Sequence, residues 1–286
     1  MTDNAQSTSI FDGTDEIIAS ALDLRPGKRL KQKSTCRRLA NAPLGTPILE
    51  TLVTDLYERI SGNWTGRIPS RENWRHERQT KLSPENKSPE VLLERAIALL
   101  GSRGLLEDWF NQVPVASGLI DGKADKRAAV DLVCHRSDRA DFVELKWGSD
   151  TPAFAAFEIL RYGLVYLLSY IERERFGYLE ISFMNVSKVN LRVLAPLEFY
   201  DSFDLPWLGH GLNEGVRTLA AKKTGGALSM GFGFLAFPSG FDLPFETGEQ
   251  VLQLEHVTED DDTCRAIVSA IRNLEPIWDN GGKETP

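Results

Sequence analysis

The segment Ala128–Lys146, AAVDLVCHRSDRADFVELK, decides the fold of this chain. Two runs rich in apolar residues, Ala128–Cys134 and Ala140–Lys146, flank the polar pentapeptide His135–Arg139. Short apolar runs on either side of a polar turn are typical of a β-hairpin. The segment therefore predicts two antiparallel strands in the middle of the sequence.

This hairpin places three charged side chains together. A turn near residues 136–139 pairs residues whose numbers add up to about 275, so Asp131 faces Glu144 across the two strands. Lys146 lies two residues beyond Glu144 and therefore on the same face of its strand. We expect two carboxylates and one ammonium group on a sheet face that is otherwise aliphatic. Unpaired buried charges are costly, so this cluster requires partners or a bound cation.

The residue types in this cluster point to metal-assisted chemistry on phosphate esters. Two carboxylates bind a hard divalent ion through oxygen, which suits Mg²⁺ (or Mn²⁺) with several retained waters. A neighbouring lysine can orient or deprotonate a water, or stabilise charge that develops on a phosphate. Phosphodiester hydrolysis is the reaction that this set serves best. The alternative is a structural ion pair between Lys146 and Glu144 or Asp131.

Two helices are expected around the hairpin. The tripeptide Ser88-Pro89-Glu90 combines an N-cap residue, a first-turn proline and an acid, and it predicts a helix that runs through Leu100. Glu94 is conspicuous there because the surrounding positions are apolar on most sides of the helix. A second helix begins at Thr151-Pro152 and continues to about Arg173.

The rest of the chain completes an α/β pattern. Further expected elements are a helix over Thr46–Ile60, strands over Asn111–Ser117, Tyr178–Val186 and Leu191–Ala195, a helix near Leu212–Lys223, a strand near Leu228–Pro238 and an amphipathic helix near Asp262–Leu274. Between them lie polar segments, among which Ser61–Lys87 mixes tryptophans with cations. We expect a central mixed sheet flanked by helices.

This order of elements and charged residues resembles the PD-(D/E)xK nuclease superfamily. The resemblance rests on Glu94 in a capped helix, a strand, Asp131, the hairpin, Glu144-Leu145-Lys146 and a long helix. It implies a restriction-endonuclease-like αβββαβ core over residues 88–195. Residues 1–87 would then be a basic, partly helical N-terminal extension, and residues 196–286 a C-terminal α/β elaboration packed on the core.

The resemblance also implies roles for individual residues. Glu94, Asp131 and Glu144 would bind magnesium, with the Leu145 carbonyl as a further ligand, and Lys146 would activate the attacking water; Glu94, Asp131, Glu144 and Lys146 form the catalytic set. Glu158 and Tyr162 on the next helix resemble the Gln-x-x-x-Tyr element of the RecB-like and NucS-like branches, whose helix lines the DNA side of the site. Two positions depart from the family pattern: Val130 stands where proline is usual, and Glu158 stands where that branch has glutamine.

Charge is distributed unevenly, which bears on a nucleic-acid partner. The whole chain has a net charge of -8, but residues 25–127 hold 19 bases and 12 acids, a net of +7, and residues 196–286 hold 6 bases and 15 acids, a net of -9. We expect DNA contacts, with RNA left open, from two basic segments, Arg25–Arg38 and Arg67–Lys81. The candidate contact residues are Arg29, Lys31, Lys33, Arg37, Arg38, Arg71, Arg75 and Arg78. The alternatives are a solvated loop for the first segment and a loop packed on the core by its tryptophans for the second.

Other features narrow the class of protein. Three dispersed cysteines suggest neither a disulfide framework nor a zinc site, and the first nine residues do not resemble a signal peptide, so we expect a cytoplasmic protein. The apolar stretch 153–170 contains Glu158 and Arg161, which favours a buried helix over a membrane span. The expected activity is a metal-dependent deoxyribonuclease in restriction, repair or phage defence, as a homodimer or with partner proteins. The alternatives are an inactive binding or assembly module of the same fold, and a small-molecule hydrolase or scaffold.

Overall fold

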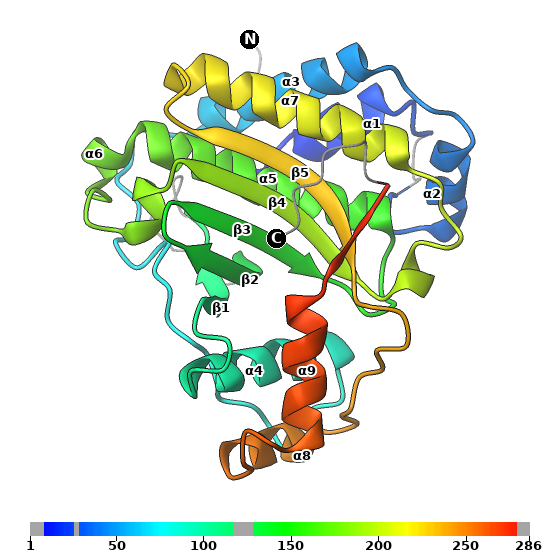
Figure 1. Cartoon of the computed structure of the whole chain (residues 1–286). Coiled ribbons are helices and arrows are strands. Elements are labelled where there is room, and N and C mark those ends of the chain that lie inside the picture. Colours follow the sequence, from blue (N-terminus) through cyan, green and yellow to red (C-terminus); the bar gives the residue numbers. More distant parts are fainter. Residues whose placement is uncertain (1–8, 26–28, 117–127, 279–286) are drawn as a thin grey trace.

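A six-stranded mixed sheet forms the centre of the computed structural model (Figure 1), which describes residues 9–25, 29–116 and 128–278. The strands lie side by side in chain order: β1 (Trp109–Pro114), β2 (Ala129–Arg136), β3 (Arg139–Leu145), β4 (Lys188–Ala195), β5 (Ser229–Ala236) and β6 (Glu275–Ile277). The pairs β1–β2, β2–β3 and β5–β6 are antiparallel, whereas β3–β4 and β4–β5 are parallel. The expected α/β class with a mixed central sheet is confirmed.

The predicted hairpin and its register are confirmed. Leu132 pairs with Val143 and Cys134 with Asp141, so the paired residue numbers add up to 275. The turn consists of residues 137 and 138, and Ser137 takes up the left-handed conformation with a φ of 50°. At the far end of the hairpin, the Leu145 amide donates a 3.0 Å hydrogen bond to the Asp131 carboxylate. At this end of the hairpin, the Asp131 side chain, and not a backbone carbonyl of β2, is therefore the acceptor for the Leu145 amide.

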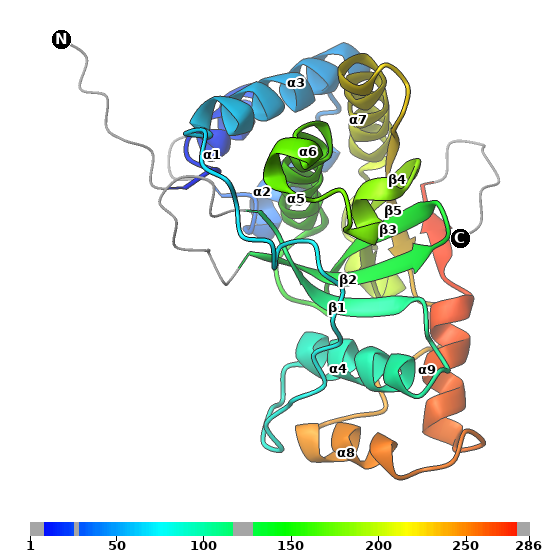
Figure 2. The same cartoon turned by 90° about the vertical axis from the view of Figure 1, so that its left-hand side faces the viewer.

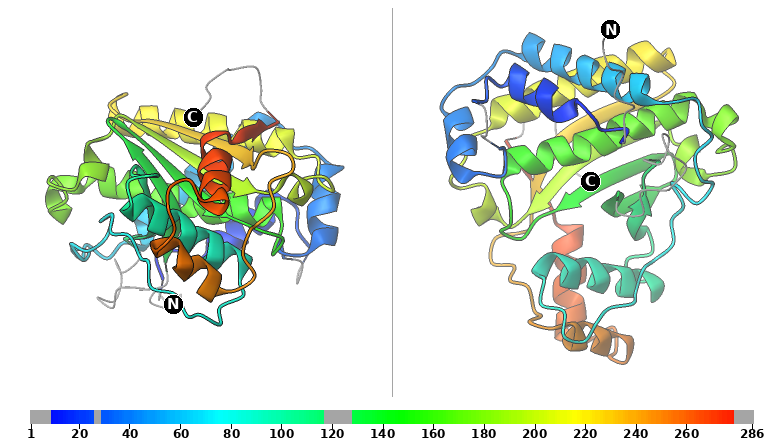
Figure 3. Two further views of the ribbon diagram at one scale, coloured as in Figure 1. Left: turned by 60° about the horizontal axis from the view of Figure 1, so that its bottom comes forward. Right: turned by 180° about the vertical axis from the view of Figure 1, so that it is seen from behind.

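One face of the sheet carries the larger hydrophobic core. Helices α5 (Pro152–Ile171) and α7 (Pro206–Thr224) pack on this face, and α3 (Thr46–Asn63) packs on both of them (Figure 2). The short helices α1 (Thr14–Ala21) and α2 (Lys33–Ala40) lie beside the N-terminal half of α5 (Figure 3, right). The α5 helix begins as predicted, with the Thr151 hydroxyl accepting a 3.2 Å hydrogen bond from the Phe154 amide.

The composition of α5 also satisfies a length and hydropathy test for a membrane span. Its most apolar window has a mean hydropathy of 1.4, and 72% of that window is buried inside the protein. Tyr166 is fully buried there and makes an edge-to-face contact with Phe142 of β3. Within the described residues, α5 is therefore the central helix of the core, as the sequence predicts.

A second, smaller core covers part of the opposite face. It is built by α4 (Pro89–Ser102), α8 (Gly248–Leu252) and α9 (Asp262–Arg272), seen together in Figure 3, left. The α4 helix starts at the predicted residue, although the Ser88 side chain makes no capping hydrogen bond. The Asp261 carboxylate caps α9 by accepting hydrogen bonds from the amides of Thr263 and Cys264.

The structure corrects several predicted elements. Residues 178–186 form no strand: a turn and the 3₁₀ helix Ser182–Asn185 follow the four-residue helix α6 (Arg173–Phe176). Because Tyr178 and Phe183 are both fully buried in the core, the apolar pattern reflects burial and not strand pairing. The basic segment Arg25–Arg38 is not only a loop, since α2 begins at Lys33. The buried side chains of α2 are Thr35, Cys36 and Leu39.

Boundaries and short elements account for the other differences. The α7 helix begins six residues before the predicted Leu212, because Gly209 and Gly211 interrupt the helical pattern in the sequence. The short elements α1, α8, β6 and the 3₁₀ helices Leu197–Phe199 and Gln253–Glu255 had no specific prediction. Predictions for the first eight residues, for part of Arg25–Arg38 and for the last residue of the strand Asn111–Ser117 lie outside the described residues.

Candidate active site

The hairpin and α5 together form a charged cluster inside the protein. The Lys146 ammonium group lies 2.7 Å from a Glu144 carboxylate oxygen and 3.0 Å from a Glu158 oxygen. Glu144 and Lys146 are 3% and 7% exposed, so this ion pair is shielded from bulk water. Asp131, on the neighbouring strand, is half-buried. The structure therefore brings together Asp131, Glu144 and Lys146 as predicted, and it adds Glu158 to them.

Glu94 approaches the same cluster from α4, but its carboxylate is already bonded. It accepts hydrogen bonds of 2.7 Å from the Asn111 amide and 3.0 Å from the Gln112 amide, and it pairs with Arg95. Asn111 and Gln112 belong to β1, where Gln112 takes up a φ of 50°. Glu94 therefore braces the α4–β1 contact, and it would have to turn away from these partners to reach a metal ion.

The carboxyl groups of the cluster hold their protons unusually strongly. Burial raises the pKa of Glu94 to about 7, with a contribution from the charge of Asp131. Burial likewise raises the pKa of Asp131 to about 6, and the nearby Glu158 and Glu90 add to this shift. The pKa of Glu144 lies well above its usual range because of burial and the charges of Asp131 and Glu158. Three neighbouring carboxyls with raised pKa values are a common signature of a functional site.

Lys146 behaves in the opposite sense. Burial alone would lower its pKa, but the carboxylates of Glu144 and Glu158 outweigh burial and raise it. The side chain is therefore a fixed cation at neutral pH. As long as both carboxylates face it, Lys146 acts as an ammonium group that donates hydrogen bonds and not as a proton acceptor.

Glu90 is a member of this region that the sequence reasoning did not select. Its carboxylate accepts hydrogen bonds of 3.0 Å from the Trp147 amide and 2.5 Å from the Ser149 hydroxyl. It therefore fastens the start of α4 to the loop that follows Lys146. Its spacing of four residues from Glu94 places both acids on one side of the helix, and this spacing was the available signal.

The donor set fits a magnesium ion only in part. Among the described residues, no group of three or more histidine, cysteine, aspartate or glutamate side chains is arranged to hold a metal ion. Asp131 and Glu144 supply two carboxylates that share one sheet face, and Mg²⁺ commonly binds through one or two carboxylates with waters completing its shell. Burial, with a smaller contribution from neighbouring acids, raises the pKa of both groups, and a divalent cation would favour their ionised forms. These two residues would hold the ion, with Glu94 joining only after reorientation.

A groove on the α5 side leads toward the cluster. This groove has a volume of about 880 Å³ and is lined by α1, by residues 24 and 29–31, and by the α5 residues Glu158, Arg161 and Tyr162. Burial and the charges of Glu144 and Glu158 raise the pKa of Tyr162. Its hydroxyl therefore stays protonated as a hydrogen-bond donor. Arg161 pairs with Asp15 of α1, which ties the groove walls together.

Part of the predicted basic set lies near this site. Lys31 pairs with Asp150 at 3.3 Å, in the loop that follows Lys146, and its ammonium lies 4.1 Å from the centre of the Phe154 ring. Lys33 and Arg37 line a cavity of about 350 Å³ together with Trp147 and Asp150. Arg29 lines the α5 groove. Lys31, Lys33 and Arg37 therefore lie beside the loop that follows β3, and Arg29 lines the same groove as Glu158.

The other predicted cations lie elsewhere or hold the fold together. Arg38 donates hydrogen bonds to the carbonyls of Leu22 and Asp23, and Arg78 donates to those of Glu107 and Trp109. Arg71 lies beside Gly177 at the end of α6, which follows α5, and the nearby Arg75 pairs with Glu72 at 3.3 Å. In the same segment, Trp74 is fully buried and stacks on Phe142. The tryptophan packing that was the alternative for this segment is therefore what the structure shows.

Comparison with known proteins adds no relative. No family model, no curated protein and no solved structure matches this chain.

Proposed function

We propose that the protein is a Mg²⁺-dependent nuclease that hydrolyses phosphodiester bonds in DNA. The observation that carries the proposal is the position of Asp131, Glu144 and Lys146 on one face of a hairpin. Glu158 of α5 completes this cluster at the mouth of a groove. A pair of carboxylates beside a buried lysine fits metal-assisted hydrolysis better than it fits a stabilising core, which would be cheaper to build from apolar residues.

The order of elements supports the same proposal. Among the described residues, the succession α4, β1, β2, β3, α5, β4, with α6 and a 3₁₀ helix between α5 and β4, follows the αβββαβ order that the family resemblance implies. The acids also occupy the expected places in it: Glu94 in the first helix, Asp131 in the second strand and Glu144 in the third. A structural ion pair alone would not require this agreement.

Each residue of the cluster has a distinct task in the proposed reaction. A bound Mg²⁺ would polarise the phosphate and lower the pKa of a water molecule. Asp131 and Glu144 would hold the ion. The Lys146 ammonium would donate hydrogen bonds to the attacking water or to a phosphate oxygen, where negative charge develops. Tyr162, protonated at the groove wall, would donate a hydrogen bond to the substrate backbone.

The surrounding charges favour a polynucleotide substrate, and we propose DNA. Arg29, Lys31, Lys33 and Arg37 gather at the loop that follows the site, and such cations bind phosphates by displacing counterions. The groove itself carries acids as well as bases, so phosphate contacts are expected mainly at its rim. The cleavage assay below compares DNA with RNA directly.

A cleavage assay tests the proposal. Purified protein is incubated with single-stranded, duplex and branched DNA and with RNA, in Mg²⁺, in Mn²⁺ and in EDTA. We expect cleavage of at least one DNA form that requires the metal and that Lys146→Met abolishes. The control, Lys222→Met, changes an exposed lysine of α7 and should cut like the wild type. Equal cleavage by Lys146→Met would show that the site is misassigned.

A second candidate function is an inactive module of the same fold that binds nucleic acid or assembles with other proteins. The existing bonds of the cluster favour it, since Lys146 is held by two carboxylates and Glu94 by three partners. Calorimetric titration with Mn²⁺ separates the two functions, because only the nuclease requires a metal site that depends on Asp131. If the cluster were merely structural, the double variant Glu144→Leu/Lys146→Met would keep or raise stability without changing any activity.

A further inference from the structure

One narrow stripe of side chains on α5 is not part of the hydrophobic core. From Pro152 to Tyr170 every residue is buried except four, which are half-buried and line the α5 groove: Phe154, Glu158, Arg161 and Tyr162. Successive steps of four, three and one residues place these side chains on one face of the helix. The stripe therefore forms one side of the groove, and Arg161 is its cation.

Arg161 lies beside the acid cluster. It follows Glu158 by three residues, which is about 4.5 Å along the helix axis, and Glu158 bonds Lys146 at 3.0 Å. One turn before Glu158, the Lys31 ammonium lies 4.1 Å from the centre of the Phe154 ring. The groove therefore carries cations on both sides of Glu158, at spacings that suit successive phosphates of a strand laid along α5.

The partner of Arg161 in this structure is weakly held. A terminal nitrogen of its guanidinium pairs with Asp15 of α1, and the Asp15 side chain is 82% exposed. Ion pairs at the protein surface contribute little free energy, because water solvates the separated charges well. The Arg161 Nε atom is buried and has no hydrogen-bond partner among the described residues. Asp15 therefore satisfies only part of a guanidinium group that has five N–H donors.

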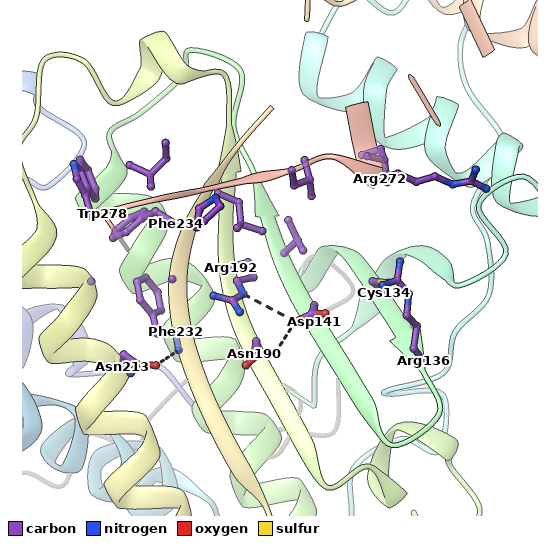
Figure 4. Close-up of a pocket in the computed structure, with 18 of the residues that line it drawn as sticks. Cys134, Arg136, Asp141, Asn190, Arg192, Asn213, Phe232, Phe234, Arg272 and Trp278 are labelled. Carbon is purple, nitrogen blue, oxygen red and sulfur yellow. Dashed lines mark hydrogen bonds and ion pairs between the residues drawn. The ribbon is translucent and has the colours of Figure 1, made fainter. Parts of the chain in front are cut away.

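The arginines on the opposite face of the sheet cannot take this role. Arg136 and Arg192 line a cavity of about 360 Å³ there (Figure 4). Arg136 pairs with Asp108 at 3.0 Å, and Arg192 lies 4.0 Å from Asp141 in the floor of the cavity. Because the sheet separates this cavity from the acid cluster, a cation that serves the cluster has to come from the α5 face.

We propose that Arg161 binds a phosphate of the DNA backbone and that Asp15 occupies the place of this phosphate when DNA is absent. On binding, the phosphate displaces the Asp15 carboxylate and accepts hydrogen bonds from the guanidinium, whose fork matches phosphate oxygens in pairs. Since Arg161 lies beside the acid cluster and not within it, the bound phosphate is a neighbour of the one that is cut. The inference rests on the proposed function for the identity of the ligand.

Fluorescence anisotropy in EDTA tests this exchange on the full chain. The probes are a labelled oligodeoxynucleotide of about 16 nucleotides and its duplex, and the variants are titrated with the form that the wild type binds more tightly. Arg161→Gln should weaken binding about tenfold, because it removes the phosphate contact. Asp15→Asn should tighten binding about twofold to fivefold, which is the factor that corresponds to the free energy of an exposed ion pair.

A double-mutant cycle separates the exchange from a general effect of charge. In the Arg161→Gln background, Asp15→Asn should lose most of its effect. The matched control is Glu16→Gln, which removes the same charge from the next exposed position of α1. It should change the affinity by one factor in both backgrounds, and by less than Asp15→Asn does in the wild type.

The results that overturn the proposal differ from those that overturn the nuclease. Equal effects of Asp15→Asn in both backgrounds, wild-type affinity of Arg161→Gln, or no binding of either DNA form would refute the role of Arg161. If Arg161→Gln fails to fold, Asp15→Asn refutes it by tightening binding no more than Glu16→Gln does. Coupling of Asp15 to Arg161 in a protein that cuts no DNA would keep this phosphate site and refute the nuclease.

Discussion

At the scale of single residues, the hairpin cluster combines groups that the fold holds at a free-energy cost. Asp131 keeps a raised pKa although the Leu145 amide and Lys146 both favour its ionised form. The sequence predicts the positions of Asp131, Glu144 and Lys146, because strand alternation and turn length determine them. It does not predict the bonds of Glu94, since these depend on Asn111 and on the left-handed backbone at Gln112.

The electrostatic cost at Asp131 leads to a stability prediction. Its pKa is raised to about 6, so ionisation at higher pH penalises the folded state relative to the unfolded chain. Without metal and at about pH 8, Asp131→Asn should raise the free energy of unfolding by on the order of 2 kcal/mol. Denaturant unfolding in EDTA measures this change.

The matched control is Asp55→Asn, which alters an exposed acid of α3. It should change the free energy of unfolding by less than about 0.5 kcal/mol. A clear loss of stability in Asp131→Asn would mean that the carboxylate is stabilised by its partners, contrary to this account.

At the scale of secondary-structure elements, the predictions succeed where the pattern is long and regular. Thr151-Pro152 specifies the start of α5 because a cap residue and a first-turn proline act locally. The failure at residues 178–186 arises because Tyr178 and Phe183 fill the core from irregular backbone. The short strand β6 contains Pro276 and pairs over three residues, so its pattern is too brief to recognise.

Close packing of α5 on the sheet gives a second prediction. A Cβ atom at Gly163 would lie 2.4 Å from a Leu191 methyl of β4. Gly163→Ala should therefore lower the free energy of unfolding by about 1–3 kcal/mol through overpacking. Gly62→Ala is the matched control, because a Cβ atom there meets nothing within 4 Å and Gly62 lies in α3. Denaturant unfolding should show that the control is neutral or stabilising; equal losses in both would contradict the packing argument.

Two histidines give a pH-dependent prediction. The rings of His76 and His135 lie 5.7 Å apart and both pack on Phe183. Burial lowers both pKa values, helped at His76 by the neighbouring His135. The folded protein then binds fewer protons than the unfolded chain, so their stabilisation is complete above about pH 6.5 and is lost as the pH falls through the lowered values.

Replacing one histidine should reduce this loss. His135→Phe keeps the ring packing and removes a buried nitrogen that lacks a hydrogen-bond partner among the described residues. Thermal unfolding from about pH 7 to 5 should show a smaller decline than in the wild type. His256→Gln, at an exposed position, serves as the control. An unchanged decline in His135→Phe would show that other groups dominate the acid sensitivity.

At the scale of the whole molecule, one sheet separates two different environments. The α5 face carries the acid cluster and its groove, whereas a cavity lined by Arg136, Arg192 and Arg272 opens on the opposite face. The net charge of -8 hides this division, and the basic N-terminal third is itself divided. Lys33 and Arg37 lie near the candidate site, but Arg71 lies at the other end of α5. The sequence alone could not show that these cations lie at different ends of α5, because their positions depend on the path of the folded chain around the sheet.

This division predicts different salt dependences for DNA binding. Each lost contact between the protein and a duplex phosphate lowers the slope of log affinity against log salt by about 0.9. Lys33→Gln/Arg37→Gln should therefore reduce the slope by roughly 2. Arg71→Gln/Arg75→Gln removes the same charge at the distant end and should leave the slope unchanged. Fluorescence anisotropy in EDTA measures the slope for both variants. A reduced slope for Arg71→Gln/Arg75→Gln and an unchanged slope for Lys33→Gln/Arg37→Gln would contradict the proposed DNA-binding surface.

The most direct test of the central claim is the initial rate at which Asp131→Asn cuts DNA in Mg²⁺. This substitution preserves the size of the side chain and an acceptor for the Leu145 amide, and it removes one of the two carboxylates assigned to the metal. With Asp55→Asn cutting at the wild-type rate, we predict that Asp131→Asn cuts at least about 100-fold more slowly while remaining folded. Cleavage by Asp131→Asn at the wild-type rate would contradict the assignment of the acid cluster as the nuclease site.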